Sequence, residues 1–589
     1  RMQRILLCSY RTPSPFFVSH RETTPFVRNV VIQTNSIWQR NLRSFCSSVK
    51  SLLGQANEGD KNAQYALGKI YKEGNSEEDI AKDAQQSFAW FSKAAENGHV
   101  GSQHELGLLY VTGRLGEPNY TEAFKWFQKA AEQEFPNSQY NLGLMYYSGI
   151  HVTRDLSEAE RYYRLAADQE FPAAQCNLGL LYLEYTDHED AFDRAVSYLS
   201  AAARNGVDVA QFHLGGIFQH HFDDIETAVD WYTKAADQNN PYALFTLADM
   251  YWKGIGVEKN VSHALEYCHR AVAAGNIEAL GLLGTITATG YDDTPPNKQQ
   301  ALEFFKKAAN EGSVEAQYHL AEGCLQLDPP DKENGMKWML IAAENNHPEA
   351  SYSIGKFAQQ EANGNESKLA TALDWFTKAA ENGLVEAMFE VGYANHHGLG
   401  TKQNYDKAHM WYSKAAHKGN AAATSNLGNL YAQGCGVRAN LPKAVELFTK
   451  ASKAGYGDAS VNLGILYLQG QIPSGEGSAL DWFTLASQQG NADGFFYLGT
   501  MFESGIGGVK VDTAQALLWY LEAARLSHPV ANYSVGKIYF RGAANVPKDP
   551  KKALAFIEAS AALGYSKARS VLPFYQLHNH NEPSTSNKE

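Results

Sequence analysis

The side chains that could do chemistry are few and scattered in this sequence of 589 residues. Two pairs of adjacent histidines, His220-His221 and His396-His397, are the densest groups of metal-ligand type. Neighbouring residues of a helix point about 100° apart, so we expect neither pair to hold one metal ion. The sequence also lacks a P-loop, an HExxH motif, a GxSxG elbow and a dinucleotide-binding fingerprint after a strand. We therefore predict no catalytic, cofactor-binding or metal-binding residue.

The cysteines do not form a recognisable ligand set. A zinc site would need closely spaced Cys or His pairs, and a disulfide framework would need a recurring spacing. Neither is present, so we interpret the four cysteines that lie within the repeat array as free thiols in a reducing compartment. The six positions are Cys8, Cys46, Cys176, Cys268, Cys324 and Cys435.

Charge is distributed unevenly along the chain. The formal net charge is −13, with +7 on residues 1–50 and −20 on the remainder. A helical array that binds RNA is expected to line its groove with Lys and Arg, which an acidic array does not favour. No pair of carboxylates stands out as an acid/base couple. These observations rank an RNA-binding array and an enzyme of an unfamiliar kind below a protein-binding scaffold.

The elements that position these side chains repeat along the sequence. A Leu-Gly or closely similar dipeptide occurs fourteen times, from Leu67-Gly68 to Val535-Gly536, at intervals of 33 to 39 residues. A period of this length is typical of stacked helix pairs, each of which buries its apolar face against its neighbours. We therefore predict an all-α fold, a right-handed superhelical α-solenoid of about fourteen helix-pair repeats.

Residues 427–455 illustrate one repeat. Leu427, Gly428 and Tyr431 share one face of a first helix because they are separated by one and four residues. A glycine-containing loop follows, and then a second helix in which small and bulky residues alternate, as close helix crossings require. Gly455 occupies what we call the closing position, where we expect a positive φ to end the second helix.

An aromatic residue stands eight positions before the closing position in thirteen of the fourteen repeats, and Leu447 is the exception. A repeated aromatic is typical of packing, so we predict that this row fills the interface between hairpins and binds no ligand. Its members are Trp90, Trp126, Tyr162, Tyr198, Trp231, Tyr267, Phe304, Trp338, Trp375, Trp411, Trp482, Trp519 and Phe556.

The closing positions predict two ways of ending a helix. Nine of the fourteen are Gly, which adopts a positive φ cheaply. In the other five a Pro follows two residues later, and we expect it to end one helix and to start the next, where its missing N–H is harmless. The five pairs are Glu134 with Pro136, Glu170 with Pro172, Asn239 with Pro241, Asn346 with Pro348 and Ser527 with Pro529.

This arrangement resembles the Sel1-like repeat family, which is related to tetratricopeptide repeats. The resemblance rests on the LGxxY starts (as in LGKIY, 67–71), the GxGV loops (254–257 and 434–437) and the KAAxxG ends (93–98 and 378–383), and it covers residues 50–575. It implies an adaptor or scaffold for protein complexes. It names no partner, so the partner-binding residues stay unknown.

The first 45 residues are rich in Arg, Ser and Thr and nearly free of acids, which is typical of a mitochondrial transit peptide. A disordered extension with no targeting role is the alternative. The chain has no apolar run near the ~18 to 20 residues that cross a bilayer, so we expect no transmembrane segment. We expect a mitochondrial location, with a cytoplasmic one as the alternative.

Four successive repeats lack the aromatic residue four positions after the dipeptide, and carry Thr287, Cys324, Ala358 and Asn395 instead. We hypothesise a looser joint at 291–398 that separates an amino-terminal arm with a capping helix (46–290) from a carboxy-terminal arm with a capping helix (399–576). Simple sequence drift is the rival explanation. Residues 577–589 are polar and are predicted to be a disordered tail.

From the sequence we therefore expect a non-enzymatic scaffold. It would bind a peptide or helix of a partner protein in a groove lined by first helices, with no nucleic acid and no cofactor. If it is imported, its expected role is assembly, maintenance or stress signalling of mitochondrial protein complexes. The alternative is an adaptor for cytosolic signalling or protein quality control.

Overall fold

The computed structural model describes residues 49–74, 81–114, 116–184, 190–291, 294–472 and 477–580. These residues form thirty α-helices, and extended pairing among them is limited to two isolated bridges. The predicted all-α solenoid of helix pairs is thereby confirmed. The chain divides between Phe304 and Phe305 into two compact units, each of which is described by itself. The predicted transit peptide, residues 1–45, lies outside the described residues.

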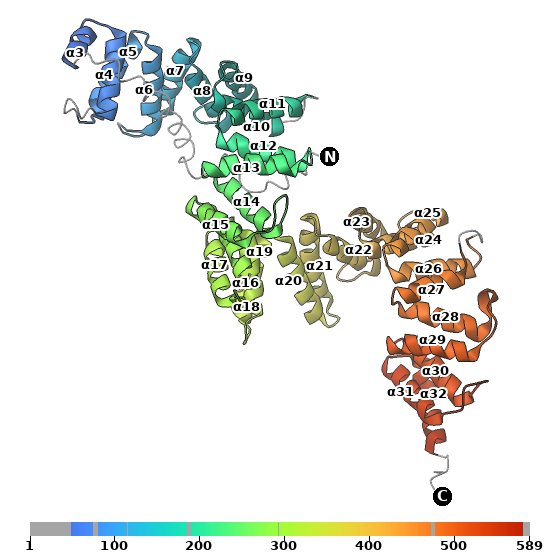
Figure 1. The fold of residues 1–589 in the computed structure, drawn as a ribbon. Coiled ribbons are helices and arrows are strands. Elements are labelled where there is room, and N and C mark those ends of the chain that lie inside the picture. Colours follow the sequence, from blue (N-terminus) through green and yellow to red (C-terminus); the bar gives the residue numbers. More distant parts are fainter. Residues whose placement is uncertain are drawn as a thin grey trace. The chain divides into compact units, whose positions relative to one another are not determined.

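In the unit that ends at Phe304, which we call the N-terminal unit, one short helix packs against the first of a series of hairpins (Figure 1). Its helices are α3 (Val49–Asn57), α4 (Lys61–Glu73), α5 (Ala84–Glu96), α6 (Val100–Thr112), α7 (Tyr120–Glu132), α8 (Pro136–Ser148), α9 (Leu156–Ala167), α10 (Pro172–Glu184), α11 (Ala191–Arg204), α12 (Asp208–His220), α13 (Ile225–Asp237), α14 (Pro241–Lys253), α15 (Val261–Ala273) and α16 (Glu278–Thr289).

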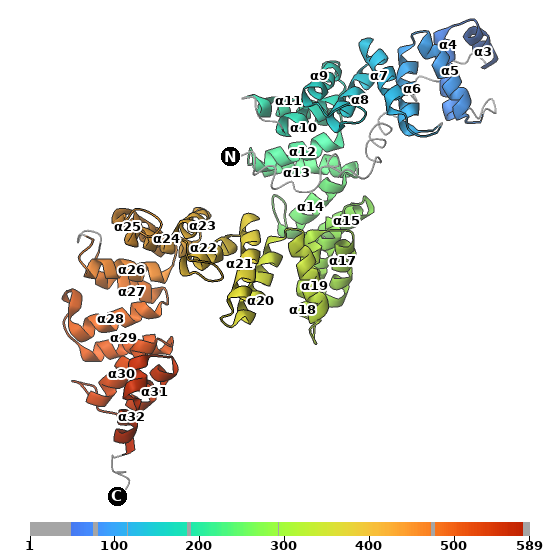
Figure 2. The same cartoon turned by 180° about the vertical axis from the view of Figure 1, so that it is seen from behind.

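Helix α17 (Lys298–Asn310) contains the division, and the rest of the chain forms the C-terminal unit (Figure 2). Its helices are α18 (Val314–Leu325), α19 (Lys332–Glu344), α20 (Pro348–Ala362), α21 (Glu366–Glu381), α22 (Val385–His397), α23 (Tyr405–His417), α24 (Ala421–Gln433), α25 (Leu441–Lys453), α26 (Gly457–Leu468), α27 (Ala479–Gln488), α28 (Ala492–Ser504), the 3₁₀-helix η2 (Ile506–Gly508), α29 (Thr513–Arg525), α30 (Pro529–Arg541), α31 (Pro550–Ala562) and α32 (Ser566–His580). Helix α32 runs four residues past the predicted end at 576, and residues 581–589 lie outside the described part.

Most hairpins close where a glycine of the first helix meets a bulky residue of the second helix. A Cβ atom at Gly143 would lie 2.6 Å from the ring of Tyr163, and one at Gly464 would lie 2.6 Å from Phe483. Both rings are almost completely buried. Glycine is therefore favoured at this position because the helices cross closely, and the two exceptions, Ala248 of α14 and Ala321 of α18, carry the smallest side chain.

The bulky residue at this crossing is not the predicted one. It stands seven positions before the closing position, one residue after the predicted aromatic row. Phe127 is fully buried, for example, whereas its neighbour Trp126 is half-buried under the ammonium group of Lys129, 4.2 Å from the ring centre. Adjacent side chains of a helix diverge by about 100°, so only one of the two can face the first helix. In the predicted aromatic row itself, only Trp90 and Trp411 are buried.

The closing positions all adopt a positive φ, including the five that are not Gly. The nine glycines have φ between 75° and 100°, and Glu134, Glu170 and Ser527 have φ near 60°. The prediction of two separate mechanisms is therefore wrong, because every second helix ends in the left-handed conformation and the proline is additional. The predicted role of the prolines is confirmed, because each of the five is the first residue of the next helix.

In most hairpins the loop is fixed by the residue that caps the second helix. Asn440, for example, accepts the N–H of Lys443 through its side chain and donates its own N–H to the carbonyl of Tyr431 over 2.8 Å. Thr287, Cys324 and Asn395, which lack the aromatic ring, still accept the same backbone bond. The loop bond is therefore kept in three of the four repeats that lack the aromatic side chain, whereas in the fourth the cap Asn365 donates its N–H to the carbonyl of Ala362 instead of Ala358. Whether residues 291–398 form a looser joint stays a prediction.

Candidate protein-binding surface

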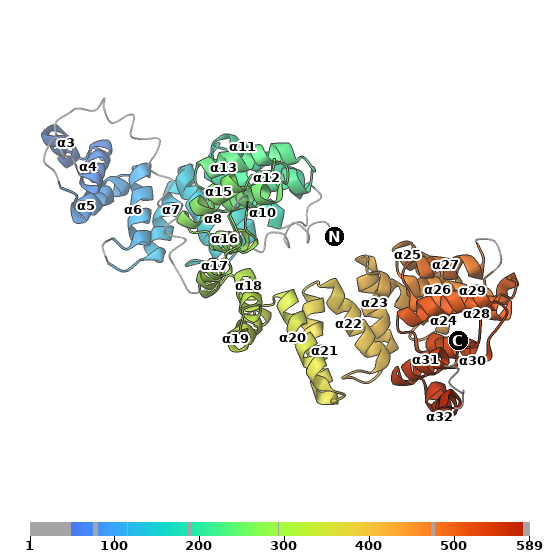
Figure 3. The same ribbon diagram turned by 60° about the horizontal axis from the view of Figure 1, so that its bottom comes forward.

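The first helices form a layer of their own within each unit. Among described helices that are not neighbours in the chain, the substantial contacts all join first helices: α4 with α6, α14 with α16, α22 with α24 and α26 with α28. Hairpins that approach more closely on one side than on the other curve toward that side. The first helices therefore line the inner face of each stack of hairpins, whose order can be followed in Figure 3.

A buried charge cluster joins the first two hairpins of the N-terminal unit. The Glu105 carboxylate of α6 accepts a hydrogen bond from Lys72 of α4 and lies 3.7 Å from Lys69. Burial raises the pKa of Glu105, but the charge and hydrogen bond of Lys72, together with the nearby His104 and Lys69, outweigh burial and hold that pKa below its ordinary value. Burial lowers the pKa of the adjacent His104 to about 4, so its imidazole is neutral near pH 7.

Histidine caps join hairpins in the C-terminal unit. His528 precedes α30, where its Nδ1 accepts the N–H of Ala531 and its Nε2 lies 2.9 Å from Asp493 of α28. His347 precedes α20 and is bound in the same way, with Nε2 3.2 Å from Glu315 of α18. Since Nδ1 accepts, the ring carries its proton on Nε2 and donates it to the carboxylate. One side chain thus caps its own helix and holds the preceding repeat.

In the N-terminal unit an asparagine side chain makes the same two contacts, one to its own helix and one to the preceding repeat. The Asn240 amide oxygen accepts the N–H of Ala243 at the start of α14, and its Nδ2 donates to Asp208 of α12 over 2.9 Å. Asn491 caps α28 and donates to Asp458 of α26 in the C-terminal unit. Because the amide does not titrate, these links do not depend on the protonation state of the cap.

The starts of the first helices carry a row of exposed carboxylates in the C-terminal unit. Each member is the second residue of its helix, where the positive end of the helix dipole stabilises an anion. Hydrogen bonds from His319 and His347 hold the pKa of Glu315 well below its ordinary value. We call this set the acidic row: Glu315, Glu349, Glu386, Asp458 and Asp493.

Sequence reasoning missed the acidic row and the caps that bind to it. The signal was available in the sequence, because each acidic residue stands three positions after a closing position and two positions after the residue that precedes the helix. The pairing could not be predicted from the sequence. Glu315 and Asp493 bind His347 and His528 of the next repeat, which stand 32 and 35 residues further along the chain.

The paired histidines do not create a metal site in the part of the chain that the structure describes. There, no group of three or more His, Cys, Asp or Glu residues is arranged to hold a metal ion. The rings of His396 and His397 nevertheless stack, with centres 4.6 Å apart. That neither histidine pair holds one metal ion stays a prediction. The exposed Tyr393 contacts His397 from one turn earlier on the inner face of α22, with ring centres 4.3 Å apart.

The cysteines within the described residues are free thiols, three of them buried and Cys435 partly exposed. Burial raises the pKa of Cys176 and of Cys268 to about 12. A thiol with so high a pKa is a poor nucleophile near neutral pH. Cys8 and Cys46 lie outside the described residues.

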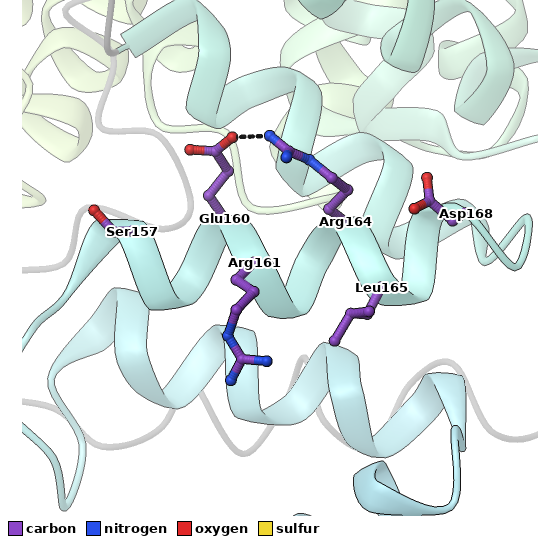
Figure 4. A pocket seen from close by; sticks show the side chains of 6 residues that line it. All are labelled: Ser157, Glu160, Arg161, Arg164, Leu165 and Asp168. Carbon is purple, nitrogen blue, oxygen red and sulfur yellow. Dashed lines mark hydrogen bonds and ion pairs between the residues drawn. The ribbon is translucent and has the colours of Figure 1, made fainter.

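A shallow hollow of about 230 Å³ lies along the outer side of α9 (Figure 4). Both arginines that line it are already paired: Arg164 with Glu160, and Arg161 with Glu158. Ligand pockets usually enclose about 300 Å³ or more and surround their ligand. This hollow is therefore a poor candidate for a small-molecule site.

The helix pairs, the glycine crossings and the layer of first helices define a class of repeat protein whose inner face is available for binding. A family model for the Sel1 repeat matches fourteen segments between residues 61 and 565. This chain belongs to the Sel1 repeat family. None of the described helices combines the length and the apolar character needed to cross a membrane.

Three curated relatives match parts of the array. An uncharacterized protein of Neisseria meningitidis is 30% identical over 178 residues, covering 30% of this chain and 36% of its own. Chitin synthase regulatory factor 3 of Schizosaccharomyces pombe is 28% identical (32% and 21% covered), and chitin synthase regulator SKT5 of Saccharomyces cerevisiae is 27% identical (26% and 23%). The matches thus span between 21% and 36% of the length of these relatives.

Solved structures of Sel1-type proteins are also similar. A protective antigen of uropathogenic Escherichia coli with an SLR fold is 27% identical, covers 85% of this chain and 99% of its own, and has a TM-score of 0.49. A Sel1 repeat protein of Oxalobacter formigenes is 25% identical, covers 72% and 99%, and has a TM-score of 0.34.

Proposed function

We propose that this protein is a non-enzymatic adaptor that binds partner proteins through the inner face of its first helices. The observation that carries this proposal is the contrast between two neighbouring positions of those helices. The glycine at the crossing is repeated with little change, whereas the next residue along is Lys69, Lys356, Tyr393, Asn429 or Lys537 in different repeats, each at least partly exposed. The fold needs the first position, and in these repeats the second is free to determine which partner binds.

Two further observations support an adaptor. The family shared with two chitin synthase regulators includes proteins that act on other proteins, as the names of those regulators state. The inner face also combines the exposed ring of Tyr393 with the partly buried Lys356–Glu390 ion pair. Such a mixture of rings and charges is typical of protein interfaces.

We place this adaptor in mitochondria, in the assembly, maintenance or stress signalling of protein complexes there. The composition of residues 1–45 supports this location. An adaptor for cytosolic signalling or protein quality control is the alternative, and location in cells separates the two.

The test is proximity labelling in cells with the full-length chain and with a version that lacks residues 1–45. We expect the full-length protein to label mitochondrial proteins and the shortened version to lose them. If both versions label one cytosolic set, the mitochondrial role is wrong and the cytosolic adaptor remains. If neither labels a reproducible set of neighbours above a diffusing control enzyme, the adaptor proposal fails.

A further inference from the structure

The last hairpin and the helix after it differ in charge from the rest of the array. Residues 529–580 contain seven Lys and Arg residues, with Asp549 and Glu558 as their only acids, which gives a net charge of +5. The whole chain has a net charge of −13. The basic segment coincides with α30, α31 and α32.

Helix α32 departs from the repeat at the position that closes every hairpin. Eight residues after the closing Gly564, where the other first helices have Leu-Gly or a close equivalent, α32 has Leu572-Pro573. At the equivalent Gly536, an added Cβ atom would already lie 2.8 Å from Ile557 of α31. A proline ring occupies more space than a Cβ atom, so no second helix can pack on α32 as α31 packs on α30.

That side of α32 exposes apolar groups. Phe574 is 47% exposed and Leu577 is 64% exposed, and Pro573 beside them is exposed as well. Tyr575 points the other way and is buried. Exposed apolar residues that adjoin one another on one helix face are typical of a binding surface.

The apolar surface is shared by two helices. The ring centre of Phe540 of α30 lies 5.5 Å from that of Phe574 and 4.7 Å from that of Tyr575, both of α32. Helix α32 also packs beside α31 (Figure 1, Figure 2, Figure 3). Residues from neighbouring first helices thus form one continuous surface on the inner face of the C-terminal unit.

Positive charges border this surface. Arg541 is exposed at the end of α30, and its charge opposes the effect of burial, which raises the pKa of Tyr575. Lys567 is exposed two turns before Phe574 on the same face of α32. Neither side chain forms an ion pair with another described residue. The rim therefore attracts an acidic partner.

The ends of this chain do not fit the surface. Residues 581–589 (NEPSTSNKE) contain no Leu, Ile, Val, Met or aromatic residue that could cover Phe574 and Leu577. Residues 1–50 carry a charge of +7, which the basic rim repels. Neither of these two segments therefore suits the surface, and its chemistry favours an acidic partner.

We propose that this C-terminal docking surface binds an amphipathic helix of a partner protein, with Asp and Glu residues flanking the apolar stripe of that helix. Such a helix would lie against α30 and α32 in the manner of other helix-in-groove complexes. The proposal deepens the adaptor function, on which it rests, by naming the chemistry of one partner. The docking surface consists of Phe540, Arg541, Lys567, Pro573, Phe574 and Leu577.

The test uses the full chain and a fluorescein-labelled helical peptide of twenty residues with a leucine stripe flanked by glutamates, followed by fluorescence anisotropy. A second peptide has every glutamate replaced by lysine. We expect saturable binding of the acidic peptide and binding at least about tenfold weaker for the basic one. Leu577→Ser and Arg541→Glu should each weaken the binding of the acidic peptide by about tenfold.

Matched controls separate the docking surface from general effects of the substitutions. Leu518→Ser removes a leucine of α29 that is 58% exposed, and Lys453→Glu reverses an exposed charge at the end of α25. Both should bind the acidic peptide as the wild type does. Since Leu577 and Arg541 are exposed, unchanged circular dichroism and melting temperature are expected to show that each variant folds.

The proposal is overturned if the acidic peptide shows no saturable binding, if both peptides bind equally, or if Leu577→Ser has no effect. Binding to phosphatidylserine vesicles that is lost in Leu577→Ser, without peptide binding, would assign the surface to a membrane. A concentration-dependent dimer that Leu577→Ser abolishes would assign it to a second copy. In each case the proximity-labelled neighbours would persist if the adaptor function itself is right.

Discussion

In the C-terminal unit five of the first helices carry an exposed acid three residues after the closing position, whereas in the N-terminal unit only Glu278, which is half-buried, stands there. Asp208 of the N-terminal unit stands one position earlier in its repeat. The two units nevertheless share the glycine crossing, the closing turn and the proline starts. One backbone plan thus supports two different surfaces.

The comparison teaches which positions the fold constrains. At the crossing, steric contact with the second helix permits only a glycine or a close substitute. In the C-terminal unit the acids at the second helical position are exposed, so that position tolerates a charged residue. Charge can therefore be placed there to join repeats, through His528 and His347, or to select a partner. The following experiments test whether the two units are alike in the packing of their hairpins and different in the polar contacts that join successive repeats.

The largest effect should come from the crossing and should be equal in both units. Gly143→Ala and Gly464→Ala each force a Cβ atom to within 2.6 Å of a buried ring. We expect each to destabilise its hairpin by about 2 to 3 kcal/mol through overpacking. Hydrogen exchange of α8–α9 and α26–α27 measures this locally, because a repeat array does not unfold in a single step.

Gly281→Ala provides the control for the crossing, since nothing lies within 4 Å of a Cβ atom added there in α16. Alanine should stabilise that helix by about 0.5 to 1 kcal/mol. A large loss in one unit and none in the other would contradict a shared packing plan.

The second effect should differ between the units. Glu105→Gln leaves the ammonium of Lys72, whose side chain is 21% exposed, without its anion and should cost about 2 kcal/mol. Glu390→Gln, in the equivalent ion pair of the C-terminal unit, should cost less than about 1 kcal/mol because Lys356 is 35% exposed and reaches water. Urea unfolding followed by hydrogen exchange compares the two.

The loss in Glu105→Gln should depend on pH. The pKa of Glu105 is below its ordinary value of 4.5, so its stabilising effect is complete above that pH and disappears as the pH falls through the lower pKa of the folded protein. The wild type and the variant should therefore converge in acid. A difference that stays constant down to pH 2 would contradict the ion pair.

A smaller effect should come from the caps. His528→Ala removes both the cap of α30 and the bond to Asp493 and should cost about 1 to 2 kcal/mol. His528→Asn should restore most of this, because Asn240 and Asn491 make both contacts elsewhere. Thermal unfolding of the three proteins tests the substitution, and an asparagine variant as unstable as the alanine variant would refute it.

The smallest effect should come from the closing positions, where the units can be exchanged. Glu134→Gly relieves a positive φ of 60° and should stabilise the N-terminal unit by about 0.5 to 1 kcal/mol. Gly455→Glu, at a φ of 87° with open space around its Cβ atom, should destabilise the C-terminal unit by a similar amount. Melting temperatures that shift in the same direction for both variants would contradict this account.

The sequence by itself determined the repeat length, the helix pairs and the starts of the helices. These features depend on local causes: the spacing of residues along one helix, the missing N–H of proline and the positions of glycine in turns. For this reason Pro136 and Pro529 could be assigned to helix starts correctly from the sequence.

Only the tertiary structure decided which of two adjacent bulky residues fills each crossing. Trp126 and Phe127 are equally apolar, and the rotation of the second helix about its axis, which the neighbouring hairpins fix, selects Phe127. It also decided that Glu134 adopts a positive φ, because the next helix has to turn back onto the stack. The bond between His528 and Asp493 and the exposure of Leu577 were likewise beyond the sequence, since both depend on how successive helices pack.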